Sequence, residues 1–143
     1  AIFLLMMPLA GLADDRLPVS TLEIATRDGK AHFFTIEMAE TPEQHAKGLM
    51  FRTEMADDAG MLFMFKDKPY AAMWMKNTLI SLDMLFIDEK GKVMFIAENT
   101  VPESLEPISA YAPTAAVLEL KGGITKKLAI TVGDTAKHHY FGN

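Results

Sequence analysis

The stretch Ile80–Asp88 (ISLDMLFID), followed by Lys92–Asn99 (KVMFIAEN), decides the fold class. Both runs are short, apolar and rich in β-branched or aromatic residues, which is typical of β-strands. The link between them is Asp88-Glu89-Lys90-Gly91, and Gly91 suits a turn position that needs a positive φ angle. The stretch therefore predicts a tight β-hairpin in the middle of the chain.

The same pattern recurs on both sides of this hairpin. Ser20–Arg27 and Ala31–Ala39 are joined by Asp28-Gly29, which is a strong hairpin signal because both central turn positions need positive φ. Further strand-like runs are Gly60–Phe65, Ala71–Met75, Ala115–Lys121 and a terminal segment that ends near Phe141. Strands at this density predict an all-β domain, a sandwich or closed barrel of short antiparallel strands with one short helix.

The helix is expected at Thr41–Met50, because its first residues carry start signals. Thr41 suits the N-cap, Pro42 suits the first helical position, and Gln44 completes a capping box. The spacing of Ala46, Leu49 and Met50 predicts that they share the inward side. A second, single helical turn is expected at 124–128, after a pair of glycines.

Composition limits the classes of function. With 143 residues, half of them hydrophobic, the chain is long enough for one domain with a substantial core. A net charge of −5 argues against a nucleic-acid partner, because phosphate binding needs a basic face. The absence of cysteine excludes disulfides, zinc ribbons, iron–sulfur clusters and cysteine nucleophiles.

The first residues have the composition of a targeting segment. Ala1–Ala13 (AIFLLMMPLAGLA) carries no charge and is too short to span a bilayer, which takes roughly 20 residues. Gly11 and Ala13 fit the small-residue pattern of a secretory cleavage site. We expect a signal-peptide remnant at 1–13, a single β domain at 14–143, and export, to the periplasm. A buried strand or an N-terminal membrane anchor is the alternative for this segment.

The middle of the chain contains a series of short stretches in a characteristic order and spacing: Gly48–Arg52, Gly60–Phe63, Trp74–Thr78, Leu82–Asp88, Ala97–Asn99 and Val117–Leu120. Together they resemble a known family of exported proteins, domain of unknown function 192. Ser81 departs from the family pattern, which has proline there. The resemblance implies a signal-bearing, mainly β protein, and it implies no activity, because the family carries none that is established.

Three polar groups interrupt apolar segments, namely Arg52, the run Lys76–Thr78, and Asp83. Asp83 lies in a strand whose two faces are both largely apolar, so its carboxylate needs a partner. Arg52 or Lys76 is the expected partner, and Arg52 is favoured because a guanidinium binds a carboxylate with two parallel hydrogen bonds. The favoured interpretation is a buried Arg52–Asp83 pair that fixes the loops, with a pocket wall as the alternative.

Two glutamates leave a catalytic alternative open. Glu98 and Glu119 lie on other expected strands, and either could converge with Asp83 into an acid/base hydrolase site. The favoured interpretation places both glutamates at strand ends or in solvent, because most acidic residues are exposed. The chain has neither a Gly-x-Ser-x-Gly motif nor a phosphate-binding glycine loop.

No metal site and no cofactor are expected. The 11 methionines could suggest a Cu(I) carrier, since thioethers are soft ligands, but they lie among apolar residues and read as core. His138 and His139 are adjacent, so on a strand they point to opposite faces.

The favoured function is a binding module of the cell envelope for a small anionic or sugar-like ligand, without catalysis. The candidate ligand-binding residues are Arg52, Trp74, Lys76, Asn77, Asp83 and Glu98. An aromatic side chain beside cationic and amide groups suits such ligands. A structural, partner-binding domain that uses the proline-rich loop at 100–113 is the third alternative. The oligomeric state stays open.

Overall fold

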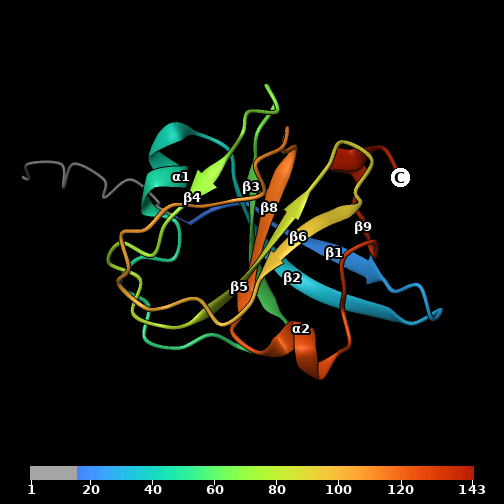
Figure 1. The fold of residues 1–143 in the computed structure, drawn as a ribbon, viewed down its shortest axis with the longest axis horizontal. Helices are drawn as coiled ribbons and strands as arrows, with labels where there is room; N and C mark the ends of the chain where they lie inside the picture. The colour runs from blue at the N-terminus through green and yellow to red at the C-terminus, as the bar shows by residue number, and fades with distance from the viewer. Residues whose placement is uncertain (1–15) are drawn as a thin grey trace, which may run out of the picture.

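The computed structural model describes residues 16–143, and the expected signal segment at 1–13 lies outside the described residues. Seven strands form one sheet, in the order β6-β5-β8-β3-β2-β1-β9 (Figure 1). They are β1 (Val19–Ala25), β2 (Ala31–Ala39), β3 (Ala59–Met64), β5 (Leu82–Ile87), β6 (Val93–Ala97), β8 (Ala116–Lys121) and β9 (Thr135–Lys137). The sheet coils into a nearly closed barrel, which confirms the all-β prediction.

Closure comes from contacts between the two edge strands. Lys92, just before β6, bridges Thr135 of β9. Val93 donates a backbone hydrogen bond to Asp134 at 2.9 Å and accepts one from Gly133 at 2.9 Å. Because these bonds join the first and last strands in the sheet order, part of each edge is covered, as stable β proteins require.

The pleat divides the apolar residues into two cores. Inside the barrel lie alternate residues of the central strands, among them Ile36, Leu85 and Leu118. The outer face carries the residues between them, including Met84 and Val117. Successive residues of a strand point to opposite faces, so the position of a side chain along β5 or β8 determines which core it joins.

An irregular second layer covers the outer core. It contains a two-stranded ribbon, β4 (Ala72–Met73) and β7 (Ile108–Ser109), with long loops on both sides. Backbone hydrogen bonds join these loops to one another, from Met75 N–H to the carbonyl of Ser104 at 2.9 Å and from Glu103 N–H to that of Thr78 at 3.0 Å. The loop expected at 100–113 therefore packs on the barrel and contributes one short strand.

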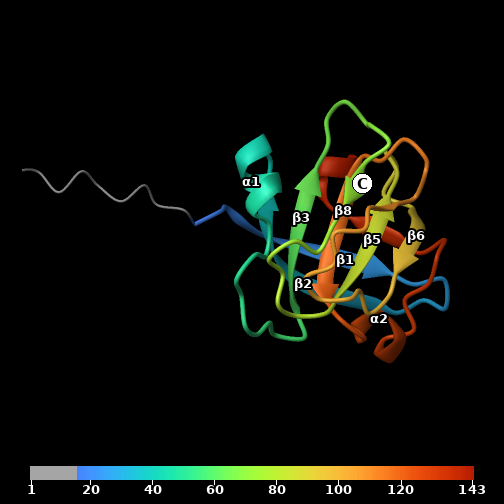
Figure 2. The ribbon, with the colours of Figure 1, turned by 60° about the vertical axis from the view of Figure 1, so that its left-hand side comes forward.

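Two short helices complete the fold. α1 (Pro42–Lys47) lies beside β3, and α2 (Ile124–Lys127) lies across one end of the barrel (Figure 2). The predicted capping box of α1 is confirmed, because Thr41 Oγ1 accepts from Gln44 N–H and Gln44 Oε1 accepts from Thr41 N–H. A third short element, the 3₁₀ turn His139–Phe141, follows β9.

The helix is shorter than expected. It ends before Gly48, whose φ of 46° breaks the helical backbone, so Leu49 and Met50 lie in the following turn. Leu49 is buried as predicted, whereas Ala46 is exposed and His45 is half-buried. The predicted inward face was therefore wrong at Ala46, because α1 buries none of its six residues.

One strand pair departs from the expected antiparallel arrangement. β2 and β3 run parallel, with Ile36 opposite Gly60. The chain between them carries α1, and a parallel pair needs such a crossover because a tight turn cannot connect two strands that point the same way. The crossover places α1 next to the outer face of β3.

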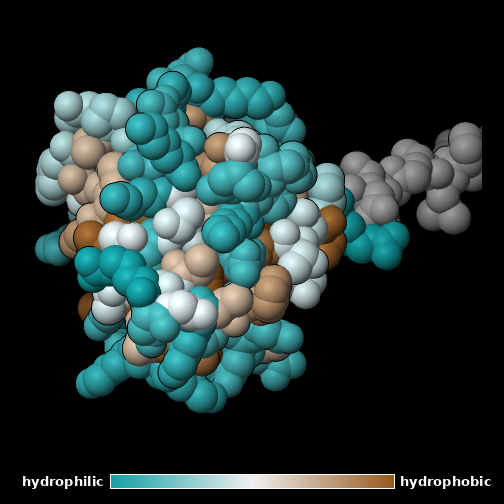
Figure 3. Space-filling model, turned by 90° about the vertical axis from the view of Figure 1, so that its right-hand side faces the viewer, coloured by the Kyte–Doolittle hydropathy of each residue, from teal (hydrophilic) through white to brown (hydrophobic). Residues whose placement is uncertain are grey.

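The side of the molecule away from α1 and β4 is mainly hydrophilic, with scattered apolar residues (Figure 3). Among residues 16–143, no helix has both the length and the apolar run that a bilayer crossing requires.

Candidate functional site

Asp83 is fully buried inside the barrel, near α2. Its Oδ1 accepts hydrogen bonds from the N–H groups of Asn99 at 2.9 Å and Gly123 at 3.0 Å. Its Oδ2 accepts from the N–H of Thr125 at 2.9 Å and from the Thr125 hydroxyl at 2.7 Å. All four contacts are with donors, so the carboxylate joins the loop after β6 to the start of α2.

The predicted Arg52–Asp83 pair is wrong. Arg52 lies on the outside and binds Glu37 with two hydrogen bonds, of 2.6 Å and 2.9 Å. The two side chains are 42% and 28% exposed, and Glu37 raises the pKa of Arg52 by hydrogen bonding to its guanidinium. Asp83 needs no cation, because backbone N–H groups supply its partners.

Asp83 does not converge with either glutamate. Glu119 lies opposite Met84 in the β5–β8 register, so it faces the outer core, whereas Asp83 lies opposite Leu120 and faces the barrel interior. Glu98 follows the end of β6 and is exposed. The paired acids that a hydrolase would need are therefore not brought together.

Glu119 is the unusual acid of this structure. It is buried, with 4% of its surface exposed, and its neighbours in the sheet are Met61 on β3 and Met84 on β5. Within residues 16–143 its carboxyl group has no hydrogen-bond or ion-pair partner. Burial raises its pKa to about 8, because a carboxylate removed from water without partners is costly.

Glu119 lines a pocket of about 220 Å³ between α1, the barrel and the β4 segment. The walls are largely apolar and aromatic, and they come from separate parts of the chain. They include His45, Leu49, Met50, Phe63, Phe65, Met73, Trp74, Lys76 and Thr78. The His45 ring lies 4.7 Å from that of Phe65 and 5.8 Å from that of Phe63, measured between centroids, and its Nε2 donates to the Ala39 carbonyl at 3.0 Å.

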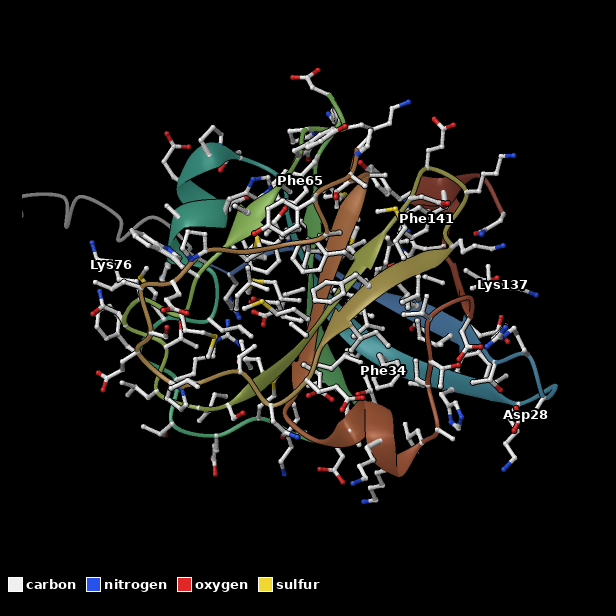
Figure 4. The ribbon with its side chains drawn as sticks, viewed as in Figure 1. Asp28, Phe34, Phe65, Lys76, Lys137 and Phe141 are labelled. Carbon is white, nitrogen blue, oxygen red and sulfur yellow. The ribbon has the colours of Figure 1, made fainter. Side chains whose placement is uncertain are left out.

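Trp74 and Lys76 form the rim of this pocket. The Lys76 ammonium lies 5.1 Å from the centroid of the Trp74 ring, within cation–π range. Trp74 is 48% exposed, so one part of its ring is open to a ligand. Figure 4 places Phe65 close to the strands and Lys76 at the outer edge of the molecule.

The other predicted site residues are distributed elsewhere. Arg52 lines a neighbouring pocket of about 210 Å³ on the other side of Gly48, with Glu43 and Gln44. Asn77 adopts a φ of 52° in the turn after Lys76, and its amide contacts the sulfur of Met50 at 3.9 Å. Trp74 and Lys76 are therefore the two predicted residues that share a pocket with a buried acid.

Glu119 and His45 are among the pocket residues that were not predicted to bind a ligand. Glu119 was considered only as a catalytic acid, although its place among apolar residues in AAVLELK was a usable signal of burial. His45 could not be assigned, because the sequence alone does not show which face of α1 packs toward the sheet.

The part of the chain that the structure describes contains no group of three or more histidine, aspartate or glutamate side chains arranged to hold a metal ion. Met61, Met75 and Met84 are fully buried in the outer core. A Ser–His contact also occurs, between Ser20 Oγ and His138 Nε2 at 2.8 Å. Since His138 Nδ1 accepts from Tyr140 N–H, Nε2 carries the proton and cannot deprotonate the serine.

A double-mutant cycle on unfolding free energy distinguishes the observed partner of Arg52 from the predicted one. For Arg52→Ala with Glu37→Ala we expect a coupling of about 0.2–1 kcal/mol, as for exposed ion pairs. For Arg52→Ala with Asp83→Asn we expect additive effects, since these residues share no partner. Denaturant midpoints at constant slope measure both cycles, and coupling between Arg52 and Asp83 would contradict the observed pairing.

Glu119 makes stability depend on pH. Between its ordinary pKa of 4.5 and its native value of about 8, the native state keeps a proton that the unfolded chain has lost. Stability from this group is therefore full below pH 4.5 and falls by about 1.4 kcal/mol per pH unit until the native pKa is reached.

We expect Glu119→Gln to remove this fall, measured by denaturant unfolding at pH 5 and pH 8. Glu54→Gln, an exposed glutamate elsewhere on the surface, is the matched control and should behave as wild type. If wild type and Glu119→Gln lose equal stability between these pH values, Glu119 is not the buried acid described above.

Comparison with known proteins assigns the chain to a family. Two solved structures are similar over most of their length. A protein from Sinorhizobium meliloti 1021, provisionally described as a transcription regulator, is 41% identical with a TM-score of 0.86, over 87% of this chain and 97% of that one. A protein of unknown function from Novosphingobium aromaticivorans DSM 12444 is 40% identical with a TM-score of 0.82, over 92% and 89%.

A search among curated proteins finds no match. The model of the DUF192 family, described as "Uncharacterized ACR", matches residues 23–138. This range runs from β1 to just beyond β9 and includes every residue of the Glu119 pocket. The chain therefore belongs to the DUF192 family.

Proposed function

We propose that this protein is an exported binding module of the cell envelope that holds a small anionic or sugar-like ligand in the Glu119 pocket. The observation that carries the proposal is Glu119 itself, a buried carboxyl group without a partner that lines a pocket. Among residues 16–143, His32 Nε2 is the only fully buried side-chain nitrogen or oxygen atom without a hydrogen-bond partner, so the carboxyl oxygens of Glu119 are open to the pocket that they line. A ligand in this pocket can supply the hydrogen-bond partner that the protein does not.

The shape and chemistry of the pocket support a ligand of about one sugar ring. Its volume of about 220 Å³ is below the roughly 300–1,000 Å³ of pockets for drug-sized molecules. The half-exposed ring of Trp74 offers a flat apolar surface for the face of a sugar. Lys76 forms no ion pair within residues 16–143, so it is available to an anionic group.

Export remains part of the proposal. It is supported by the uncharged, apolar composition of Ala1–Ala13 and by the small residues at its end.

The other classes of function have less support. We propose no nucleic-acid role, since the chain carries a net charge of −5. The hydrolase alternative has no support from a pair of acids, because Asp83 does not lie with Glu98 or Glu119. The partner-binding alternative stays a prediction, and one observation favours it: the loop at 100–113 exposes Val101, Leu105 and Tyr111.

Trp74 is the only tryptophan, so its fluorescence reports directly on the pocket. We expect glucose, glucuronate or inorganic phosphate to change the emission in a saturable titration. Lys76→Ala should weaken binding of the anionic probes about fivefold, the effect of roughly 1 kcal/mol from one rim charge.

Lys137→Ala is the matched control for this titration. Lys137 is also an exposed lysine but lies on the other side of the molecule (Figure 4), so it should bind as wild type. The proposal fails if none of the three probes changes the emission of Trp74. Equal weakening by the two lysine substitutions would show only nonspecific attraction.

A further inference from the structure

We infer that Glu119 determines specificity as a hydrogen-bond donor, and that the ligand is a small sugar acid whose anionic group meets Lys76 and whose oxygen acceptor reaches Glu119. This inference rests on the proposed function and names its ligand class. It follows from the surroundings of Glu119 at the floor of the pocket and from the charges at the rim.

The surroundings of Glu119 favour its protonated form. In the sheet it is flanked by Met61 and Met84, which offer no strong hydrogen-bond donor. The dominant influence on its carboxyl group is burial, which raises its pKa to about 8. At neutral pH the group therefore carries a proton and can donate one hydrogen bond to a ligand.

The other polar and charged groups near Glu119 have partners of their own. On α1, His45 donates to the Ala39 carbonyl, and Lys47 lines the pocket with a partner of its own. Lys121, on the same face of β8, binds Asp57 at 3.0 Å. Beyond Met61, Glu37 is held by Arg52.

The covering layer adds one cation and no acid to the pocket. Lys76 lies at the rim, while Glu103 and Glu106 of the loop at 100–113 are exposed and do not line the pocket. No charged group of residues 16–143 thus forms a contact that would ionise Glu119.

This arrangement selects among ligands. A cation or an amino sugar would face the Lys76 ammonium at the rim and would find a neutral acid at the floor. A neutral sugar would gain the hydrogen bond at Glu119 but would offer no charge to Lys76, which would keep only its contact with the Trp74 ring. A sugar acid satisfies both, with its carboxylate at the rim and a hydroxyl or ring oxygen at the floor.

Calorimetric titration with glucuronate, glucose and glucosamine tests the inference on the full chain. Wild type should bind glucuronate most tightly at pH 6.5. Its affinity for glucuronate should fall about thirtyfold by pH 9.5, because at 1.5 pH units above the pKa about one molecule in thirty still carries the proton.

Glu119→Gln provides the decisive comparison, because an amide donates a hydrogen bond at every pH. It should bind glucuronate within about threefold of wild type at pH 6.5 and should show little of the loss at pH 9.5. Any loss of lysine charge at the higher pH affects wild type and Glu119→Gln equally, so the difference between the two proteins reports on residue 119. Glu54→Gln is the matched control and should follow wild type at both pH values.

The outcomes separate the two claims. If wild type binds glucuronate but its affinity is unchanged or rises with pH, or if glucosamine is preferred, Glu119 acts as a carboxylate and the inference is overturned. Loss of binding in Glu119→Gln at pH 6.5 also overturns it. If none of the three sugars binds wild type, the proposed ligand class and the inference fall together.

Discussion

A carboxyl group that folding removes from water must either find hydrogen-bond donors or keep its proton, and this constraint organises the structure around β5 and β8. Asp83 satisfies this constraint by accepting four hydrogen bonds, from donors of Asn99, Gly123 and Thr125. Those bonds join the loop after β6 to α2 at one end of the barrel. Glu119 has no hydrogen-bond donor among the described residues, so it satisfies the constraint by keeping its proton.

The pleat explains why these two acids have different roles. Asp83 and Glu119 lie on adjacent strands, yet they face opposite sides of the sheet. The interior face is packed by the regular strands of the barrel, which leave backbone N–H groups near Asp83 only where a loop and α2 meet. The outer face is covered by α1 and the irregular β4–β7 layer, which leaves a pocket over Glu119.

Local patterns were enough to predict most strands, the β1–β2 and β5–β6 hairpins and the capping box of Thr41, because turn residues and side-chain alternation act over a few positions. The parallel β2–β3 pair and the partner of Asp83 depend on how distant segments meet. A buried carboxylate suggested a cation such as Arg52, whereas backbone N–H groups, which every segment carries, satisfied it. Trp74 and Lys76 could be singled out from the sequence, but their meeting with Glu119 required the barrel.

The protonation state of Glu119 is the central claim, and difference infrared spectroscopy between wild type and Glu119→Gln measures it directly. At pH 6.5 we expect wild type to show the C=O stretching band of a protonated carboxyl group that the variant lacks. This band should give way to carboxylate bands as the pH passes about 8. A difference spectrum that contains only carboxylate bands at pH 6.5 would contradict the claim.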